Sequence, residues 1–157
     1  MLEDFASRSE MSPDPARANP EIVCVIRNED VAAYLHLAMS KNGFEFQRFR
    51  TASEFVASLV HFVPRIVISK RHFEDDFHAK HMCEIIRTHY REPYVYMILL
   101  SSSHDLDDIQ AALDAGFDDY MVEPFYPQQI HSRLMVARKW IHYLDQILSV
   151  QPGMRRG

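Results

Sequence analysis

Residues 115–125 read AGFDDYMVEPF, and this stretch contains a helix end, a short strand and a chain break in consecutive positions. Gly116 ends a helix that apolar spacing predicts over 105–115, because glycine accepts the left-handed backbone that follows a last helical turn. Asp118 to Val122 then form a short strand, which Glu123-Pro124 closes. The order of helix, glycine, strand and break is typical of one unit in a chain that alternates helices with strands.

The same alternation runs back from this stretch to Glu21. Continuous apolar runs predict buried strands at 22–26, 65–69 and 94–100, and alternating phenylalanines predict an edge strand at 44–49. Asn28 and the capping box from Thr51 to Glu54 mark helix starts. Further helices are expected around 82–86 and over 127–150. We therefore predict an α/β fold: a doubly wound, five-stranded parallel sheet with right-handed crossovers, in three α/β/α layers.

The composition is that of a soluble globular protein. The chain has 157 residues, of which 47% are hydrophobic and 25% charged, with a net charge of −5. These values exclude a wholly disordered chain and do not indicate a nucleic-acid binder. No apolar run could span a bilayer, and no secretory signal is present. Cys24 and Cys83 lie far apart in apolar surroundings, so we expect reduced thiols in a cytoplasmic protein.

Three segments are expected along the chain. Serines and prolines without a hydrophobic period predict a disordered amino-terminal tail at 1–20. The alternating region at 21–143 forms the domain. Residues 144–157 continue the last helix and end in a flexible tail.

Residues 115–125 resemble the response-regulator receiver domain, which reads AGADDYxxKPF at the corresponding positions. Two further stretches carry the resemblance: PRIVISK at 64–70, where the family has PDLVLLD, and MILLSS at 97–102. The resemblance covers 21–143. It implies the flavodoxin-like, CheY-like (βα)5 fold and a role in two-component phosphorelay signal transduction.

The functional crevice of an open parallel sheet lies at the carboxyl ends of its strands. The predicted strands place six residues there: Arg27, Asn28, Lys70, Ser101, Glu123 and Pro124. The resemblance implies an acidic pair at the first two positions, a phospho-accepting aspartate at the third and a lysine at the fifth. It also implies a hydroxyl at Ser101 and a switch aromatic at Tyr120, both of which are kept.

The departures from the family pattern remove phosphotransfer chemistry. Lys70 has no carboxylate to form an acyl phosphate, and Arg27 with Lys70 places positive charge where Mg²⁺ needs oxygen ligands. Glu123 would repel a phosphoryl group. We therefore predict a degenerate pseudo-receiver with no catalytic residues, no cofactor and no metal, hence not an enzyme. We also predict an ion pair between Lys70 and Glu123, with Arg27 competing for Glu123. The resemblance implies a cis peptide before Pro124.

The predicted last helix is more apolar than one contact face requires. Several of its apolar residues follow a heptad pattern, and others make further faces apolar. Its candidate interface residues are Leu134, Ala137, Trp140, Ile141, Leu144 and Leu148. We predict a homodimer through this helix, with 105–115 and the fifth strand as additional contacts.

Two other groups of residues leave alternatives open. A zinc site could be drawn from His72, His78 and His81, although a solvated loop explains their loose spacing better. Asp75 or Asp76 could replace the missing acceptor, which would give a receiver that is still phosphorylated with Mg²⁺. A third alternative is a ligand or metal sensor that reuses the crevice. We favour a phosphorylation-independent interaction or dimerisation module. Its partners would be proteins of a two-component pathway, with no nucleic acid and no membrane.

Overall fold

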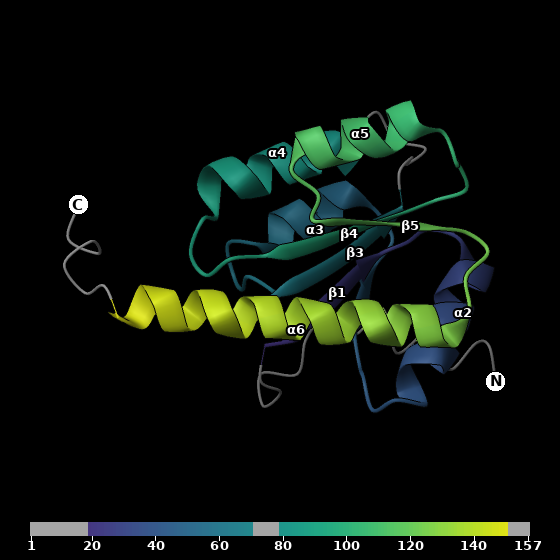
Figure 1. Ribbon diagram of the computed structural model, residues 1–157, viewed down its shortest axis with the longest axis horizontal. Coiled ribbons are helices and arrows are strands. Elements are labelled where there is room, and N and C mark those ends of the chain that lie inside the picture. The colour runs from purple at the N-terminus through teal and green to yellow at the C-terminus, as the bar shows by residue number, and fades with distance from the viewer. Residues whose placement is uncertain (1–18, 71–78, 151–157) are drawn as a thin grey trace.

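The protein, described by a computed structural model over residues 19–70 and 79–150, forms one parallel sheet between two layers of helices (Figure 1). The strands and helices are β1 (Ile22–Val25), α2 (Glu29–Ser40), β2 (Gln47–Phe49), α3 (Ala52–Ser58), β3 (Ile66–Lys70), α4 (Ala79–His89), β4 (Tyr96–Ser101), α5 (Leu106–Ala115), β5 (Asp119–Val122) and α6 (Pro127–Val150). All paired strands are parallel, in the order β2-β1-β3-β4-β5. The predicted fold class is confirmed.

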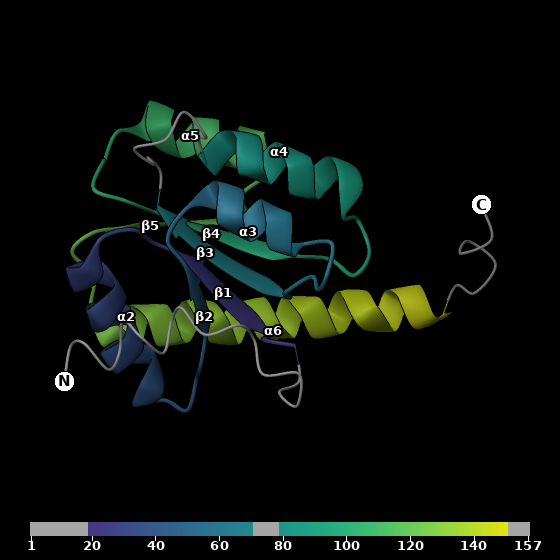
Figure 2. The ribbon, with the colours of Figure 1, turned by 180° about the vertical axis from the view of Figure 1, so that it is seen from behind.

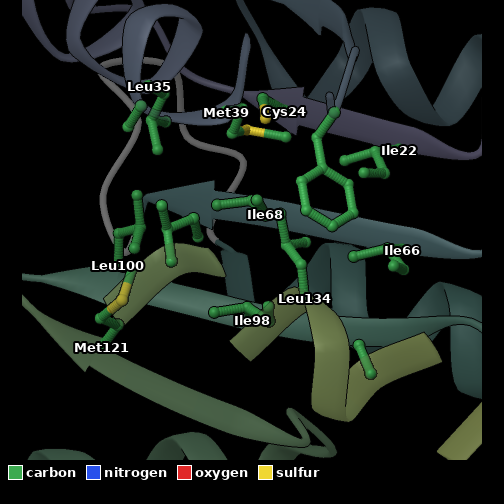
Figure 3. Close-up of a cluster of buried hydrophobic side chains, with 14 of the residues drawn as sticks. Ile22, Cys24, Leu35, Met39, Ile66, Ile68, Ile98, Leu100, Met121 and Leu134 are labelled. Carbon is green, nitrogen blue, oxygen red and sulfur yellow. The ribbon is translucent and has the colours of Figure 1, made fainter. Parts of the chain in front are cut away.

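The two faces of the sheet have separate cores because neighbouring residues in a strand point to opposite faces. Helices α2 and α6 cover one face, and α3, α4 and α5 cover the other (Figures 1 and 2). On the α2–α6 side, Ile22, Cys24, Ile66 and Ile68 pack against Leu35, Met39 and Leu134 (Figure 3). The strands are therefore buried on both faces, as their continuous apolar runs predicted.

The predicted helix caps are present. The side chain of Asn28 accepts a hydrogen bond from the Val31 amide, and that of Thr51 from the Glu54 amide. Gly116 caps α5 with a φ of 111°. One strand prediction is too long, because β2 begins at Gln47 rather than at Phe44. The amide of Phe44 bonds the carbonyl of Met39 and so belongs to the turn that ends α2.

The prediction for the last helix needs a correction. Leu134, Ala137 and Ile141 are buried in this chain's own core, so they are wrong as interface candidates. Leu144 and Leu148 are partly buried, and Trp140 is exposed. The heptad pattern is present in α6, but its first three residues, Leu134, Ala137 and Ile141, pack against the sheet.

Two ion pairs fasten α6 to the amino-terminal end of the sheet. Arg138 donates hydrogen bonds to both carboxylate oxygens of Glu21, and Arg65 donates to both carboxylate oxygens of Asp145. Asp145, the α6 residue of the second pair, lies past the predicted domain boundary at 143. Helix α6 continues through that boundary without a break. In the part of the chain that the structure describes, no helix combines the length and apolarity needed to cross a bilayer.

Candidate functional site

Lys70 and Glu123 form an ion pair at the carboxyl end of the sheet, as predicted. Lys70 ends β3 and Glu123 directly follows β5, so the pair reaches across the intervening strand β4. Their side chains are only 25% and 18% exposed. The ion pair is therefore largely shielded from solvent and lies across the carboxyl end of the sheet.

The first strand's end is held by a residue that the sequence did not single out. The side chain of Arg48, in β2, is 3% exposed and donates hydrogen bonds of 2.8 Å to the main-chain carbonyls of both Ile26 and Arg27. It also binds the carboxylate of Glu29 at 2.9 Å and 3.3 Å. One guanidinium thus ties β2, the β1–α2 loop and the start of α2 together.

The sequence did contain a signal for Arg48. Phe44, Phe46 and Arg48 alternate along the chain, which is the spacing of one strand face. An arginine on an apolar face has to be hydrogen-bonded when it is buried. The hydrogen bond from Arg48 also lowers the pKa of Glu29.

The two positions that correspond to the family's acidic pair have other roles here. Asn28 caps α2, and its carboxamide oxygen is used in that cap. The side chain of Arg27 is exposed, while its carbonyl accepts from Arg48. Neither residue supplies a carboxylate to the crevice.

Ser101 and Tyr120 meet at the loop that follows β4. The buried Ser101 hydroxyl accepts a hydrogen bond from the amide of Ser103, and the Tyr120 hydroxyl donates to the carbonyl of Ser103 at 3.0 Å. The Tyr120 ring packs against the core on the α3–α5 side. Ser103 is the link between them, and its own hydroxyl binds Asp108. The peptide before Pro124 is cis, as the resemblance implied.

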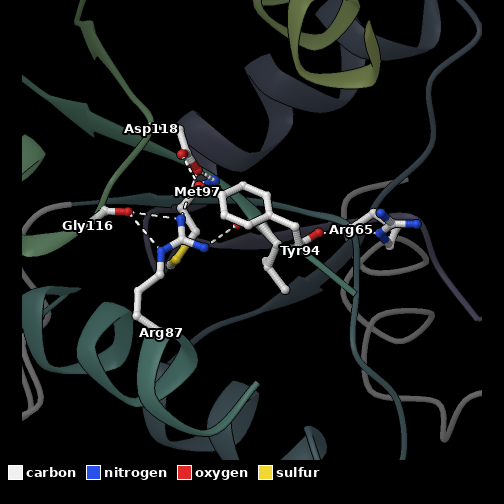
Figure 4. A network of polar contacts seen from close by, with 7 residues as sticks. Arg65, Arg87, Tyr94, Met97, Gly116 and Asp118 are labelled. Atoms are coloured by element: carbon white, nitrogen blue, oxygen red, sulfur yellow. Dashed lines mark hydrogen bonds and ion pairs between the residues drawn. The ribbon is translucent and has the colours of Figure 1, made fainter. Parts of the chain in front are cut away.

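A second polar network, at the opposite end of the strands, is centred on Asp118. Its carboxylate accepts from Arg87, from the Tyr94 hydroxyl and from the Met97 amide (Figure 4). Arg87 also donates to the carbonyls of Gly116 and Val95. The network joins α4 to the starts of β4 and β5, so its role is structural.

The other predicted ligands fall in two parts of the chain. Asp75, Asp76, His72 and His78 lie in 71–78, outside the described residues. His81 is in α4, where its ring lies 3.8 Å from Glu84. Within residues 19–70 and 79–150, no three histidine, cysteine or acidic side chains gather as metal ligands would.

Comparison with known proteins places this fold among receiver domains. The chain resembles the signal receiver domain of an HD domain-containing protein from Pseudomonas fluorescens, with a TM-score of 0.72 and 23% identity over 87% of this chain and 98% of that one. It also resembles the chemotaxis protein CheY4 of Vibrio cholerae, with a TM-score of 0.67 and 14% identity over 76% of this chain and 99% of that one. The chain therefore has the CheY-like receiver fold.

Sequence comparison gives one weaker relationship. The chain is 26% identical over 113 residues to the transcriptional regulatory protein GltR of Pseudomonas aeruginosa, which covers 72% of this chain and 46% of that protein. The chain thus spans less than half the length of this relative. No family model matches the chain.

Proposed function

We propose that this chain is a pseudo-receiver: a receiver-type domain that works without phosphorylation, as a protein–protein interaction or dimerisation module of cytoplasmic two-component signalling. The fold and the similarity to a transcriptional regulatory protein support the receiver assignment. The replaced crevice residues support its independence from phosphate.

The ion pair of Lys70 and Glu123 carries this proposal. An acyl phosphate needs a carboxylate at the end of β3, and the side chain there is an ammonium that already binds Glu123. At a separation of about 4 Å and an effective dielectric of about 20, the attraction is on the order of 4 kcal/mol before desolvation. Desolvation offsets much of that gain, so the pair holds geometry more than it adds stability.

The β1–α2 loop is also held without a metal ion. In an acidic crevice, a divalent cation would draw the loop and the strand end together through oxygen ligands. Here the Arg48 guanidinium supplies positive charge and donates directly to the loop carbonyls. Two carboxylates at this end of the sheet, Glu29 and Glu123, are already paired with Arg48 and Lys70, so they are not free to bind a metal ion.

The loop after β4 is held by hydrogen bonds within the chain. Ser101 and Tyr120 both bond the main chain of Ser103. We infer that the switch residues hold one arrangement constitutively, so that partners read a fixed surface.

Intact mass and oligomeric state, measured with and without acetyl phosphate and Mg²⁺, test the proposal. A receiver domain with aspartate at the end of its third strand serves as the positive control. We expect no mass gain and no change in oligomeric state for this chain. A gain of one phosphoryl group would overturn the proposal, and loss of that gain in Asp75→Asn or Asp76→Asn would locate the acceptor.

A further inference from the structure

Helix α6 carries a second apolar stripe, distinct from the one that covers the sheet. Val136, Trp140, Tyr143 and Ile147 follow one another at spacings of four, three and four residues. That spacing is the heptad pattern of a helix that packs against another helix. Their exposed fractions are 54%, 46%, 54% and 38%, respectively. The dimer stripe, as we name these four residues, is thus open to solvent.

The centre of the dimer stripe is ordered and lies beside a hollow. The rings of Trp140 and Tyr143 stack at 5.8 Å with an angle of 28° between their planes. Together with Val136, Lys139, Tyr96 and Asp118 they line an open cavity of about 540 Å³. Stacked rings beside a hollow offer a partner both a flat apolar surface and a place for one large side chain.

We propose that the dimer stripe binds the dimer stripe of a second copy, with the two α6 helices antiparallel about a two-fold axis between Trp140 and Tyr143. This inference rests on the proposed function as an interaction or dimerisation module and names its partner. In such an isologous contact every pairing occurs twice: if one residue of the first copy contacts a different residue of the second copy, the reciprocal contact is also made. Trp140 packs on Tyr143 of the second copy, and Val136 packs on Ile147 of the second copy.

The antiparallel direction sets unlike residues of the dimer stripe against each other. The first half of α6 covers the sheet, and the second half extends past it (Figures 1 and 2). The cavity lies beside the middle of α6, where Val136, Lys139, Trp140 and Tyr143 line it together with Tyr96 and Asp118. In the antiparallel register the Tyr143 ring of the second copy meets Trp140 at the edge of this cavity, whereas a parallel pair would set Trp140 against Trp140.

The charges along the stripe permit this contact. Lys139 lies opposite Gln146 of the second copy in the antiparallel register, so no like charges meet there. Asp145 is engaged with Arg65, and Arg138 with Glu21. Asp118, which lines the cavity beside the stripe, is bound to Arg87, so it brings no unpaired negative charge to a contact between two chains that each have a net charge of −5.

The area available is sufficient for a reversible dimer. A fully covered aromatic side chain buries about 150–250 Å², and roughly half of each ring residue is exposed here. Adding Val136, Ile147 and the flanking polar side chains, two copies would bury on the order of 1,000 Å², the lower bound for a specific interface. We therefore expect a concentration-dependent dimer rather than an obligate one.

Disulfide trapping tests the direction of the helices. The variants Val136→Cys and Ile147→Cys are mixed and oxidised; Cys24 and Cys83 are fully buried and do not compete. The antiparallel dimer predicts the mixed disulfide as the main product, because these positions face each other across the axis. A parallel dimer would give the two homodisulfides instead, and that result would overturn the proposal.

Sedimentation of the unmodified chain and of stripe variants tests the surface itself. We expect Trp140→Glu, and independently Ile147→Glu, to raise the dimer dissociation constant at least tenfold. Tyr126→Glu is the matched control, because Tyr126 is 75% exposed and lies outside the stripe. Far-ultraviolet circular dichroism shows whether each variant is folded. A monomer at all concentrations, or equal weakening by Tyr126→Glu, would overturn the inference, whereas the pseudo-receiver proposal fails only if acetyl phosphate labels the chain.

Discussion

Replacing Arg48 by methionine removes a side chain that ties β2 to the β1–α2 loop. Methionine keeps most of the apolar stem, so the change deletes hydrogen bonds more than it opens a cavity. The carbonyls of Ile26 and Arg27 each lose a donor at 2.8 Å. A buried acceptor left without a donor costs about 1–3 kcal/mol, and water can reach the Arg27 carbonyl more easily than that of Ile26.

The other contributions are smaller and partly opposed. The ion pair with Glu29, whose side chain is 57% exposed, contributes at most about 1 kcal/mol. Methionine also avoids the desolvation penalty of a buried guanidinium, and this offsets part of the lost stability. We expect Arg48→Met to lower the free energy of unfolding by about 2–4 kcal/mol. For a chain of this length that corresponds to a fall in melting temperature of about 5–15 °C.

Urea unfolding at neutral pH measures this loss, with the m-value expected to stay unchanged. Glu29→Gln is the matched control, because it removes the ion pair but leaves the Arg48–carbonyl bonds, and it should cost less than about 1 kcal/mol. The reasoning would be refuted if Arg48→Met changed stability by less than about 0.5 kcal/mol. It would also be refuted if Glu29→Gln were equally destabilising.

Three further predictions concern the crevice, a glycine and an ion pair. Lys70→Asp alone should stay unlabelled by acetyl phosphate and Mg²⁺ in intact-mass measurements, because its carboxylate would face Glu123 while Arg27 remains; labelling would contradict our account of the crevice. Gly116→Ala should lower the free energy of unfolding by about 1–3 kcal/mol, since φ is 111° and a new Cβ would lie 3.1 Å from Arg87 Cγ. Gly43→Ala, where φ is 76° and the space is open, should cost about 1 kcal/mol by the same urea assay, and the reverse order would contradict this reading. Hydrogen bonds from Arg65 lower the pKa of Asp145, so this pair stabilises the fold above the ordinary carboxyl range and the gain is lost as the pH falls through the lowered pKa. Asp145→Asn should therefore be about 0.5–1 kcal/mol less stable at pH 7. The difference should begin to shrink as the pH falls below about 4 and disappear below the lowered pKa of Asp145. A constant difference at all pH values would count against the ion pair.

The sequence was sufficient for most of the fold because its strands are short, apolar and separated by clear caps. Asn28, Thr51 and Gly116 act locally, so their roles could be read without knowing any distant contact. The failure at Phe44 has a local cause too: alternation continued into a turn, where the ring packs in the core without belonging to a strand.

The candidate site could be predicted in part. The positions of Lys70 and Glu123 at strand ends followed from the alternation of strands and helices, and their opposite charges predicted the pair that the structure shows. Arg48 was missed because its side chain bonds main-chain carbonyls of another segment, and Ser103 because its own main-chain atoms make the bonds to Ser101 and Tyr120. Sequence patterns describe side chains and carry little information about which carbonyl a buried donor will reach.

By itself, the sequence determined the order of strands and helices, the residues at each strand end and the absence of a carboxylate at position 70. Only the tertiary structure decided which apolar stripe of α6 covers the sheet and which remains exposed. Periodicity shows that residues share a helix face, but the rotation of the helix depends on all the side chains packed beneath it. Buried Leu134 and exposed Trp140 lie on neighbouring stripes of one helix, and packing against the strands is the physical reason that one is core and the other surface.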